Sequence, residues 1–188
     1  MAIKVYIDQG HNPQNPNAGA EGNGLREQDL VYTIGILLAE LLQSNGNFEV
    51  KLSRPTPDTQ LGTSTATSLQ TRVREANTWG ANIFISLHTN ASVITSASGS
   101  EALVYSANSA AYALGEDIVK WLSIITGLQN RGVSIRKDLY VLRRTAMPAV
   151  LVELGFISNP SDAALMQNSP NLFAEGVYNG ILEYFGLL

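Results

Sequence analysis

The amino-acid sequence predicts a single α/β domain. The chain has 188 residues, a length typical of one domain with a substantial buried core. Short apolar runs over residues 3–7, 83–87 and 149–152 are rich in β-branched side chains, which is typical of buried strands. Between these runs, apolar residues recur at the spacing of amphipathic helices. Strands and helices therefore alternate along the chain without an internal repeat or a linker, and this order favours the α/β class.

The N-terminal half predicts a helix on either side of a further strand. Residues 30–42 carry apolar side chains at helical spacing, and the stop signal Ser44-Asn45-Gly46 follows them. Residues 48–52 alternate between apolar and polar side chains, so they predict a half-exposed strand. Residues 69–76 predict the next helix, which we expect to end at Gly80.

The C-terminal half predicts further helices with recognisable ends. Residues 114–125 predict a helix that ends at Gly127. In Asn159-Pro160 and Ser169-Pro170, a capping residue precedes a proline at the first position of a helix. The last helix carries one apolar stripe, formed by Phe173, Val177, Ile181 and Phe185.

Long polar loops are predicted over residues 12–24, 55–67 and 91–99, which are rich in Gly, Asn, Ser, Thr or Pro. The first follows His11 directly, and the third follows the segment that carries His88. Loops that are held by a rigid scaffold often carry binding residues. We therefore expect the loops to surround a site for an extended, polar substrate.

The overall composition argues against several classes of protein. The net charge is −4 and no run rich in Lys or Arg occurs, so we expect neither a nucleic acid nor an anionic membrane as partner. No apolar stretch approaches the roughly 18 residues of a membrane span. The absence of cysteine excludes disulfides, a thiol nucleophile and cysteine ligands to zinc. The predicted first strand begins at Ile3, so we expect no signal peptide, either because none is made or because it has been removed.

Candidate metal ligands occur where the predicted strands end. His11 and His88, the only histidines, each follow an apolar run, and Glu153 directly follows a third. The carboxyl ends of strands in an open α/β sheet form the ligand-binding edge. Catalytic zinc commonly takes three His, Asp or Glu ligands and leaves a position for water. This pattern predicts a zinc hydrolase with His11 and His88 as ligands.

The third ligand is predicted to be Glu27, with Asp29 as the alternative. Glu27 opens the predicted helix across the loop from His11, and a βα connection returns that helix to the same sheet edge. Asp29 is rotated by about 200° from Glu27 around a helix, so both cannot face one ion.

The proton carrier is predicted to be Glu153. With both imidazoles assigned to the metal, a carboxylate must handle the proton, and burial at the end of an apolar strand should raise its pKa toward neutrality. The alternative is a structural cap or an ion pair with Arg143 or Arg144. A serine triad is not supported, because Ser86 lies in no Gly-x-Ser-x-Gly elbow.

A set of motifs extends over nearly the whole chain. They are Ile7-Asp8-Gln9-Gly10-His11, Glu27-Gln28-Asp29-Leu30, Leu69-x-x-Arg72-x-x-x-Ala76-Asn77, Ser86-Leu87-His88-Thr89-Asn90, Arg131-Gly132-Val133, Leu139-Tyr140-Val141-Leu142-Arg143 and Met147-Pro148-Ala149-Val150-Leu151-Val152-Glu153-Leu154-Gly155-Phe156-Ile157-Ser158-Asn159. In this order they resemble the zinc-dependent N-acetylmuramoyl-L-alanine amidases of the Amidase_3 family, which are bacterial cell-wall hydrolases. The chain departs from the family pattern at Gln9, where Pro or Ala is usual, and at Asn12, which is often Gly.

The resemblance implies a three-layer α/β sandwich with a mixed, mainly parallel sheet of about six strands and helices on both faces. It implies that residues 1–188 are one catalytic domain that cuts the amide between N-acetylmuramic acid and L-alanine in peptidoglycan. It also implies a Zn²⁺ ion held by His11, Glu27 and His88, with Glu153 as general base. Asn90 and Arg143 are candidates for substrate contact.

The cell wall, outside the cell, is the place of action that this resemblance implies. We expect a monomer whose wall-targeting domain or activator, if it has one, lies outside this chain.

Two rival functions remain open at this point. A zinc carboxypeptidase also uses two His and a Glu, but neither histidine begins the short His-x-x-Glu motif of that class; Arg131 or Arg136 could serve its terminal carboxylate. A non-catalytic wall-binding module could keep the same fold, although the chain retains Glu153 and all the predicted ligands. Products released from purified peptidoglycan distinguish these functions.

Overall fold

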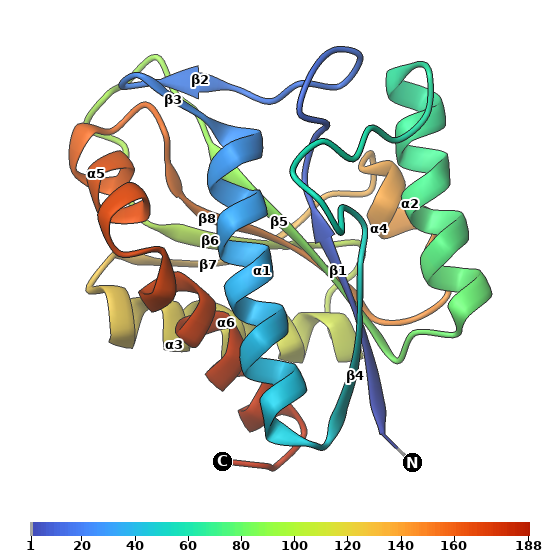
Figure 1. Ribbon diagram of the computed structural model, residues 1–188. Coiled ribbons are helices and arrows are strands. Elements are labelled where there is room, and N and C mark those ends of the chain that lie inside the picture. The colour runs from blue at the N-terminus through green and yellow to red at the C-terminus, as the bar shows by residue number, and fades with distance from the viewer. Residues whose placement is uncertain (1) are drawn as a thin grey trace.

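The computed structural model describes residues 2–188 and shows one α/β domain with three layers (Figure 1). Its central sheet has six strands in the order β4-β1-β5-β8-β6-β7. These strands are β4 (Phe48–Leu52), β1 (Ile3–Gln9), β5 (Ile83–Asn90), β8 (Ala149–Phe156), β6 (Ser100–Val104) and β7 (Asn130–Ile135). All neighbouring pairs are parallel except β6 with β8. The prediction of a mixed, mainly parallel sheet is confirmed.

Helices cover both faces of this sheet. They are α1 (Glu27–Asn45), α2 (Thr65–Trp79), α3 (Ala110–Thr126), α4 (Tyr140–Arg144), α5 (Pro160–Asn168) and α6 (Pro170–Tyr184). The larger apolar core lies between the sheet and α1, α3 and α6, whereas α2 and α4 pack on the other face. A short hairpin of β2 (Glu21–Gly22) and β3 (Leu25–Arg26) precedes α1 (Figure 1).

Alternation along β5 determines which side chains point to the face of the sheet that α2 and α4 cover, here called the second face. Ile83, Ile85 and Leu87 are buried in the larger core. Because successive side chains of a strand point to opposite faces, Phe84 and His88 lie on the face of α2 and α4. In β8, the same alternation places Glu153 on this second face.

The helix ends agree with the predicted signals, with one exception. Helices α1, α2 and α3 end at Gly46, Gly80 and Gly127, each of which has a left-handed backbone. Asn159 caps α5, because its side chain accepts hydrogen bonds from the first turn. The side-chain cap expected at Ser169 is wrong. This residue joins α5 to α6, and its backbone N–H closes α5 while its side chain makes no capping bond.

The strands extend farther than the apolar runs indicate. β5 continues to Asn90 and β8 to Phe156, because backbone pairing between them continues past the apolar residues. His88 and Glu153 therefore lie within strands, and the expectation that they follow strand ends is wrong. Among residues 2–188, no helix is long and apolar enough to cross a membrane.

Candidate metal centre

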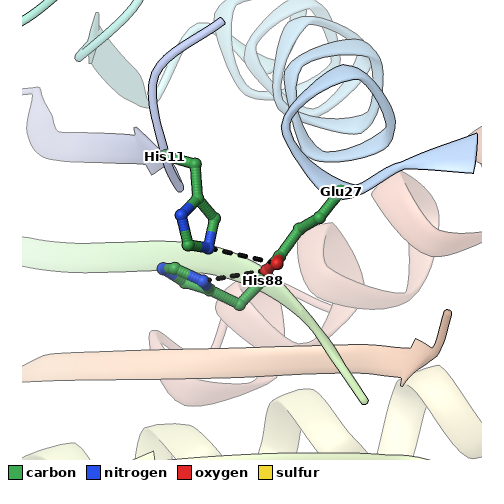
Figure 2. A group of neighbouring side chains, drawn as sticks. All are labelled: His11, Glu27 and His88. Carbon is green, nitrogen blue, oxygen red and sulfur yellow. Dashed lines mark hydrogen bonds and ion pairs between the residues drawn. The ribbon is translucent and has the colours of Figure 1, made fainter. Parts of the chain in front are cut away.

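Three side chains from separate elements converge at the end of the sheet where β1 stops (Figure 2). His11 follows β1, Glu27 is the first residue of α1, and His88 lies in β5. Glu27 Oε2 lies 3.1 Å from His11 Nε2, and Glu27 Oε1 lies 3.1 Å from His88 Nδ1. The imidazole rings are 4.8 Å apart and nearly perpendicular. The structure thus brings together the three residues that the sequence predicts as ligands.

The carboxylate of Glu27 is held in place by backbone groups as well as by the imidazoles. Its Oε2 accepts a hydrogen bond from Ala20 N and its Oε1 accepts one from Thr89 N, both at 2.9 Å. Glu27 is only 3% exposed. Burial favours the neutral acid, but the hydrogen bonds to His11 and His88 outweigh it and lower the pKa of Glu27. The carboxylate is therefore ionised and pre-oriented.

The backbone of His11 is in the left-handed region, with φ of 65°, which side chains rarely adopt. The guanidinium of Arg72, from α2, donates hydrogen bonds to the carbonyls of His11 and Gln9 and pairs with the buried Asp8. Asp8 also accepts a 2.7 Å hydrogen bond from Ser86 Oγ. This buried network fixes the unusual turn that aims His11 at Glu27.

Two glycines allow the ligands to approach each other. A Cβ atom at Gly10 would lie 2.6 Å from Cε1 and Nε2 of His88. A Cβ atom at Gly19 would lie 2.8 Å from Glu27 Oε2 and 2.9 Å from His11 Cδ2. Since real Cβ contacts essentially never fall below 3.0 Å, any larger residue would displace the ligands.

Glu153 stands beside this group on the neighbouring strand, in register with His88. Its Oε2 is buried and has no hydrogen-bond partner among residues 2–188. Burial, together with the negative charges of Glu27 and Glu101, raises the pKa of Glu153 to about 7, while His88 opposes this shift. Within the same part of the chain, no ion pair joins Glu153 to Arg143 or Arg144, and both arginines are exposed.

The remaining candidates lie outside the converging group. Asp29 is exposed and pairs with Arg26 at 3.4 Å, so it points away as its helical position predicts. Asn90 ends β5, and its side chain accepts a hydrogen bond from the next residue. Arg143 is exposed on α4.

Glu101 is a residue that the sequence reasoning missed. It faces Glu153 across the β6–β8 pair and accepts a 2.5 Å hydrogen bond from Ser134 Oγ. An acidic residue immediately before the apolar run of β6 is the only local signal of this position. Glu101 matters for the site because it lies opposite Glu153, which belongs to a strand distant in sequence.

The geometry fits a zinc ion. Zinc in proteins binds His nitrogen and Glu oxygen at about 2.0–2.2 Å, so tetrahedral ligand atoms lie about 3.3–3.5 Å apart. Glu27 places one oxygen 3.1 Å from His11 Nε2 and the other 3.1 Å from His88 Nδ1, and ligand atoms of the three residues lie within 4.8 Å of one another. Two His and one Glu form a donor set of catalytic zinc sites, in which a fourth position stays open.

Comparison with known proteins gives a consistent family. The sequence model of the N-acetylmuramoyl-L-alanine amidase family Amidase_3 matches residues 5–183. The N-acetylmuramoyl-L-alanine amidase CwlM of Bacillus licheniformis is 34% identical over 189 residues, which cover 98% of this chain and 70% of CwlM.

Two solved catalytic chains share the fold over nearly their full length. The catalytic domain of CwlV, an N-acetylmuramoyl-L-alanine amidase from Bacillus (Paenibacillus) polymyxa var. colistinus, is 31% identical with a TM-score of 0.86, and the match covers 99% of each chain. The CwlD amidase from Clostridioides difficile, solved in complex with the GerS lipoprotein, is 26% identical with a TM-score of 0.88. That match covers 99% of this chain and 100% of CwlD.

Proposed function

The chain belongs to the N-acetylmuramoyl-L-alanine amidase family, and from this premise we propose that it hydrolyses peptidoglycan with a zinc ion held by His11, Glu27 and His88. The bond cut is the amide between the lactyl group of N-acetylmuramic acid and L-alanine of the stem peptide. The observation that carries this proposal is the convergence of the three ligand side chains beside Glu153. We further propose that residues 1–188 act as one catalytic domain.

Hydrolysis of an unactivated amide requires a strong nucleophile, a stabilised oxyanion and a protonated leaving amine. A zinc ion, when bound, would polarise the carbonyl and acidify a water molecule. Glu153 accepts the proton of the attacking water on its carboxylate. As the water oxygen bonds to the carbonyl carbon and the C–N bond breaks, the same carboxyl group passes that proton to the alanine nitrogen. The products are a carboxylic acid and a free amino terminus.

Three properties of Glu153 support this role. Its buried Oε2 has no partner among the described residues, so its hydrogen-bonding capacity is not used by the fold. A pKa of about 7 lets one carboxyl group take up and release a proton near neutral pH. The residue also adjoins the metal ligands, because it is in register with His88.

The place of action follows from the substrate. We propose that the protein works at the cell wall, outside the cell, and that it acts as a monomer. CwlM is longer than this chain, which covers 70% of it, and CwlD was solved with a lipoprotein partner. By analogy, a wall-targeting domain or an activator outside this chain would direct the enzyme to its substrate.

Amino-terminal analysis of digested peptidoglycan tests the proposed reaction. The zinc-loaded protein should release new L-alanine amino termini, a chelator should abolish them, and added zinc should restore them. Released C-terminal residues would instead indicate a carboxypeptidase. Binding to the wall without any product would indicate a non-catalytic module.

A further inference from the structure

Arg54 is a buried cation whose role the proposed reaction does not explain. It follows β4 by two residues and is only 1% exposed. Among residues 2–188 it pairs with no carboxylate. Its Nη1 donates a 2.9 Å hydrogen bond to the carbonyl of Gln28, and its Nη2 donates a 3.0 Å bond to the carbonyl of Pro57. Removing a charge from water is costly unless ion pairs or hydrogen bonds compensate, and among the same residues only backbone carbonyls do so.

The bond to Gln28 reaches the first turn of α1, directly after Glu27. This helix begins without the usual side-chain cap, because Arg26 at the N-cap position makes no capping hydrogen bond. A side-chain cap would accept hydrogen bonds from backbone N–H groups, which Arg54 cannot do. Arg54 instead donates to a carbonyl of the same turn and lies 5.2 Å from the ring of Tyr32, so it anchors the turn without replacing the cap.

The side chain of Gln9 fixes the backbone of Arg54 by two hydrogen bonds. Its Oε1 accepts a 2.9 Å hydrogen bond from Arg54 N, and its Nε2 donates a 3.1 Å bond to Arg54 O. The amide side chain thus pairs with the backbone of Arg54 as a neighbouring strand would. Gln9 is fully buried. The resulting chain of contacts runs from β1 through Arg54 to the first turn of α1.

A glycine in α1 makes room for this arrangement. A Cβ atom at Gly35 would lie 2.5 Å from Gln9 Cγ and 3.2 Å from Gln9 Cδ. The three atoms nearest to that Cβ all belong to the side chain of Gln9. Replacing Gly35 by alanine would therefore press first on Gln9.

We propose that Arg54 is a positioning residue for Glu27, and that Gln9, seated over Gly35, keeps Arg54 in place. This inference rests on the proposed function, because it assigns Arg54 to the orientation of a metal ligand. Residues that hydrogen-bond directly to metal ligands typically change metal affinity by about 10–100-fold when mutated, and Arg54, which reaches Glu27 through the carbonyl of the next residue, should fall at the lower end of this range. The loss should therefore appear in zinc affinity, beyond any loss of fold stability.

The test is zinc affinity, measured on the metal-free protein by competition with a chelator, together with the unfolding midpoint of the same metal-free sample. Arg54→Met and Gln9→Ala should each weaken zinc binding by about ten-fold. Arg74→Met, on the exposed face of α2, controls for loss of an arginine. Gly176→Ala, whose Cβ would lie 2.9 Å from Leu122 Cα far from the ligands, controls for destabilisation alone. Both controls should keep the wild-type affinity.

A double substitution separates the role of Gln9 from general packing. Gly35→Ala should weaken zinc binding in the wild-type background but should add no loss in the Gln9→Ala background. Equal losses in both backgrounds, or unchanged affinity in both Arg54→Met and Gln9→Ala, would overturn the inference. If Arg54→Met does not fold, Gln9→Ala carries the test. Absence of zinc binding by the wild-type protein would instead contradict the proposed function. Failure of the Arg54 inference and failure of the proposed function are therefore distinguishable.

Discussion

Glu153 stands opposite His88 across the pairing of β8 with β5, on the strand next to one of the three converging side chains. The metal ligand and the proton carrier are therefore placed by sheet register and not by loops. Residues on a rigid scaffold hold their geometry more precisely than residues on loops. The register next to His88 therefore places Glu153 where its loss should strongly reduce turnover.

Glu153→Gln keeps the size of the side chain but removes its ability to carry a proton. We expect zinc content and fold to be nearly unchanged, because Glu153 is outside the ligand group. General acid–base groups contribute about 10²–10⁴-fold to rate, and turnover of peptidoglycan should fall by at least the lower value. Retention of more than about a tenth of the activity would show that another group carries the proton.

The pH dependence of turnover should report the ionisation of Glu153. The carboxylate form is the base, so activity should rise with pH through the pKa of Glu153, which burial raises to about 7. A bound dication favours the carboxylate, so the midpoint in the zinc-loaded enzyme should lie at or below that value.

Glu101→Gln should move this midpoint to lower pH. The negative charge of Glu101 raises the pKa of Glu153 across the β6–β8 pair, so its removal lowers that pKa. Glu49→Gln, exposed on β4 at the edge of the sheet, is the matched control and should leave the profile unchanged. An unshifted profile in Glu101→Gln would mean that the acid limb belongs to another group.

Gly10→Ala should reduce zinc affinity, because the added Cβ would lie 2.6 Å from the ring of His88 and displace it. Gly46→Ala is a useful control. This glycine has φ of 77° at the end of α1, so the change should cost about 1–2 kcal/mol of stability without touching the ligands. Zinc titration and thermal unfolding of both variants check the prediction. Equal zinc affinity in the two variants would argue against close ligand packing at Gly10.

Much of the fold could be predicted from local patterns. The periodicity of residues 30–42 and the stop at Gly46 predict α1, because both signals depend on neighbours in sequence. Local patterns do not predict the individual strands β6 and β7. Their place at the sheet edge depends on pairing with β8, a strand far along the chain, which short apolar runs do not encode.

The candidate site likewise has residues that the sequence predicts and supporting residues that it does not predict. His11, Glu27, His88 and Glu153 could be proposed because reactive side chains follow recognisable apolar runs or open a helix. Their supports could not be proposed. The bonds of Arg72 to β1 and of Arg54 to α1 join residues that are distant in sequence, and they become apparent only when the register of the sheet is known.

The central claim, that His11, Glu27 and His88 hold one zinc ion, is tested most directly by measuring bound zinc in two neighbouring variants. Glu27→Ala removes the carboxylate that lies 3.1 Å from both histidines, whereas Asp29→Ala removes an exposed carboxylate on the same helical turn. Metal analysis after dialysis should find about one zinc per chain in the wild type and in Asp29→Ala, and little or none in Glu27→Ala. Zinc retained by Glu27→Ala and lost from Asp29→Ala would contradict the account.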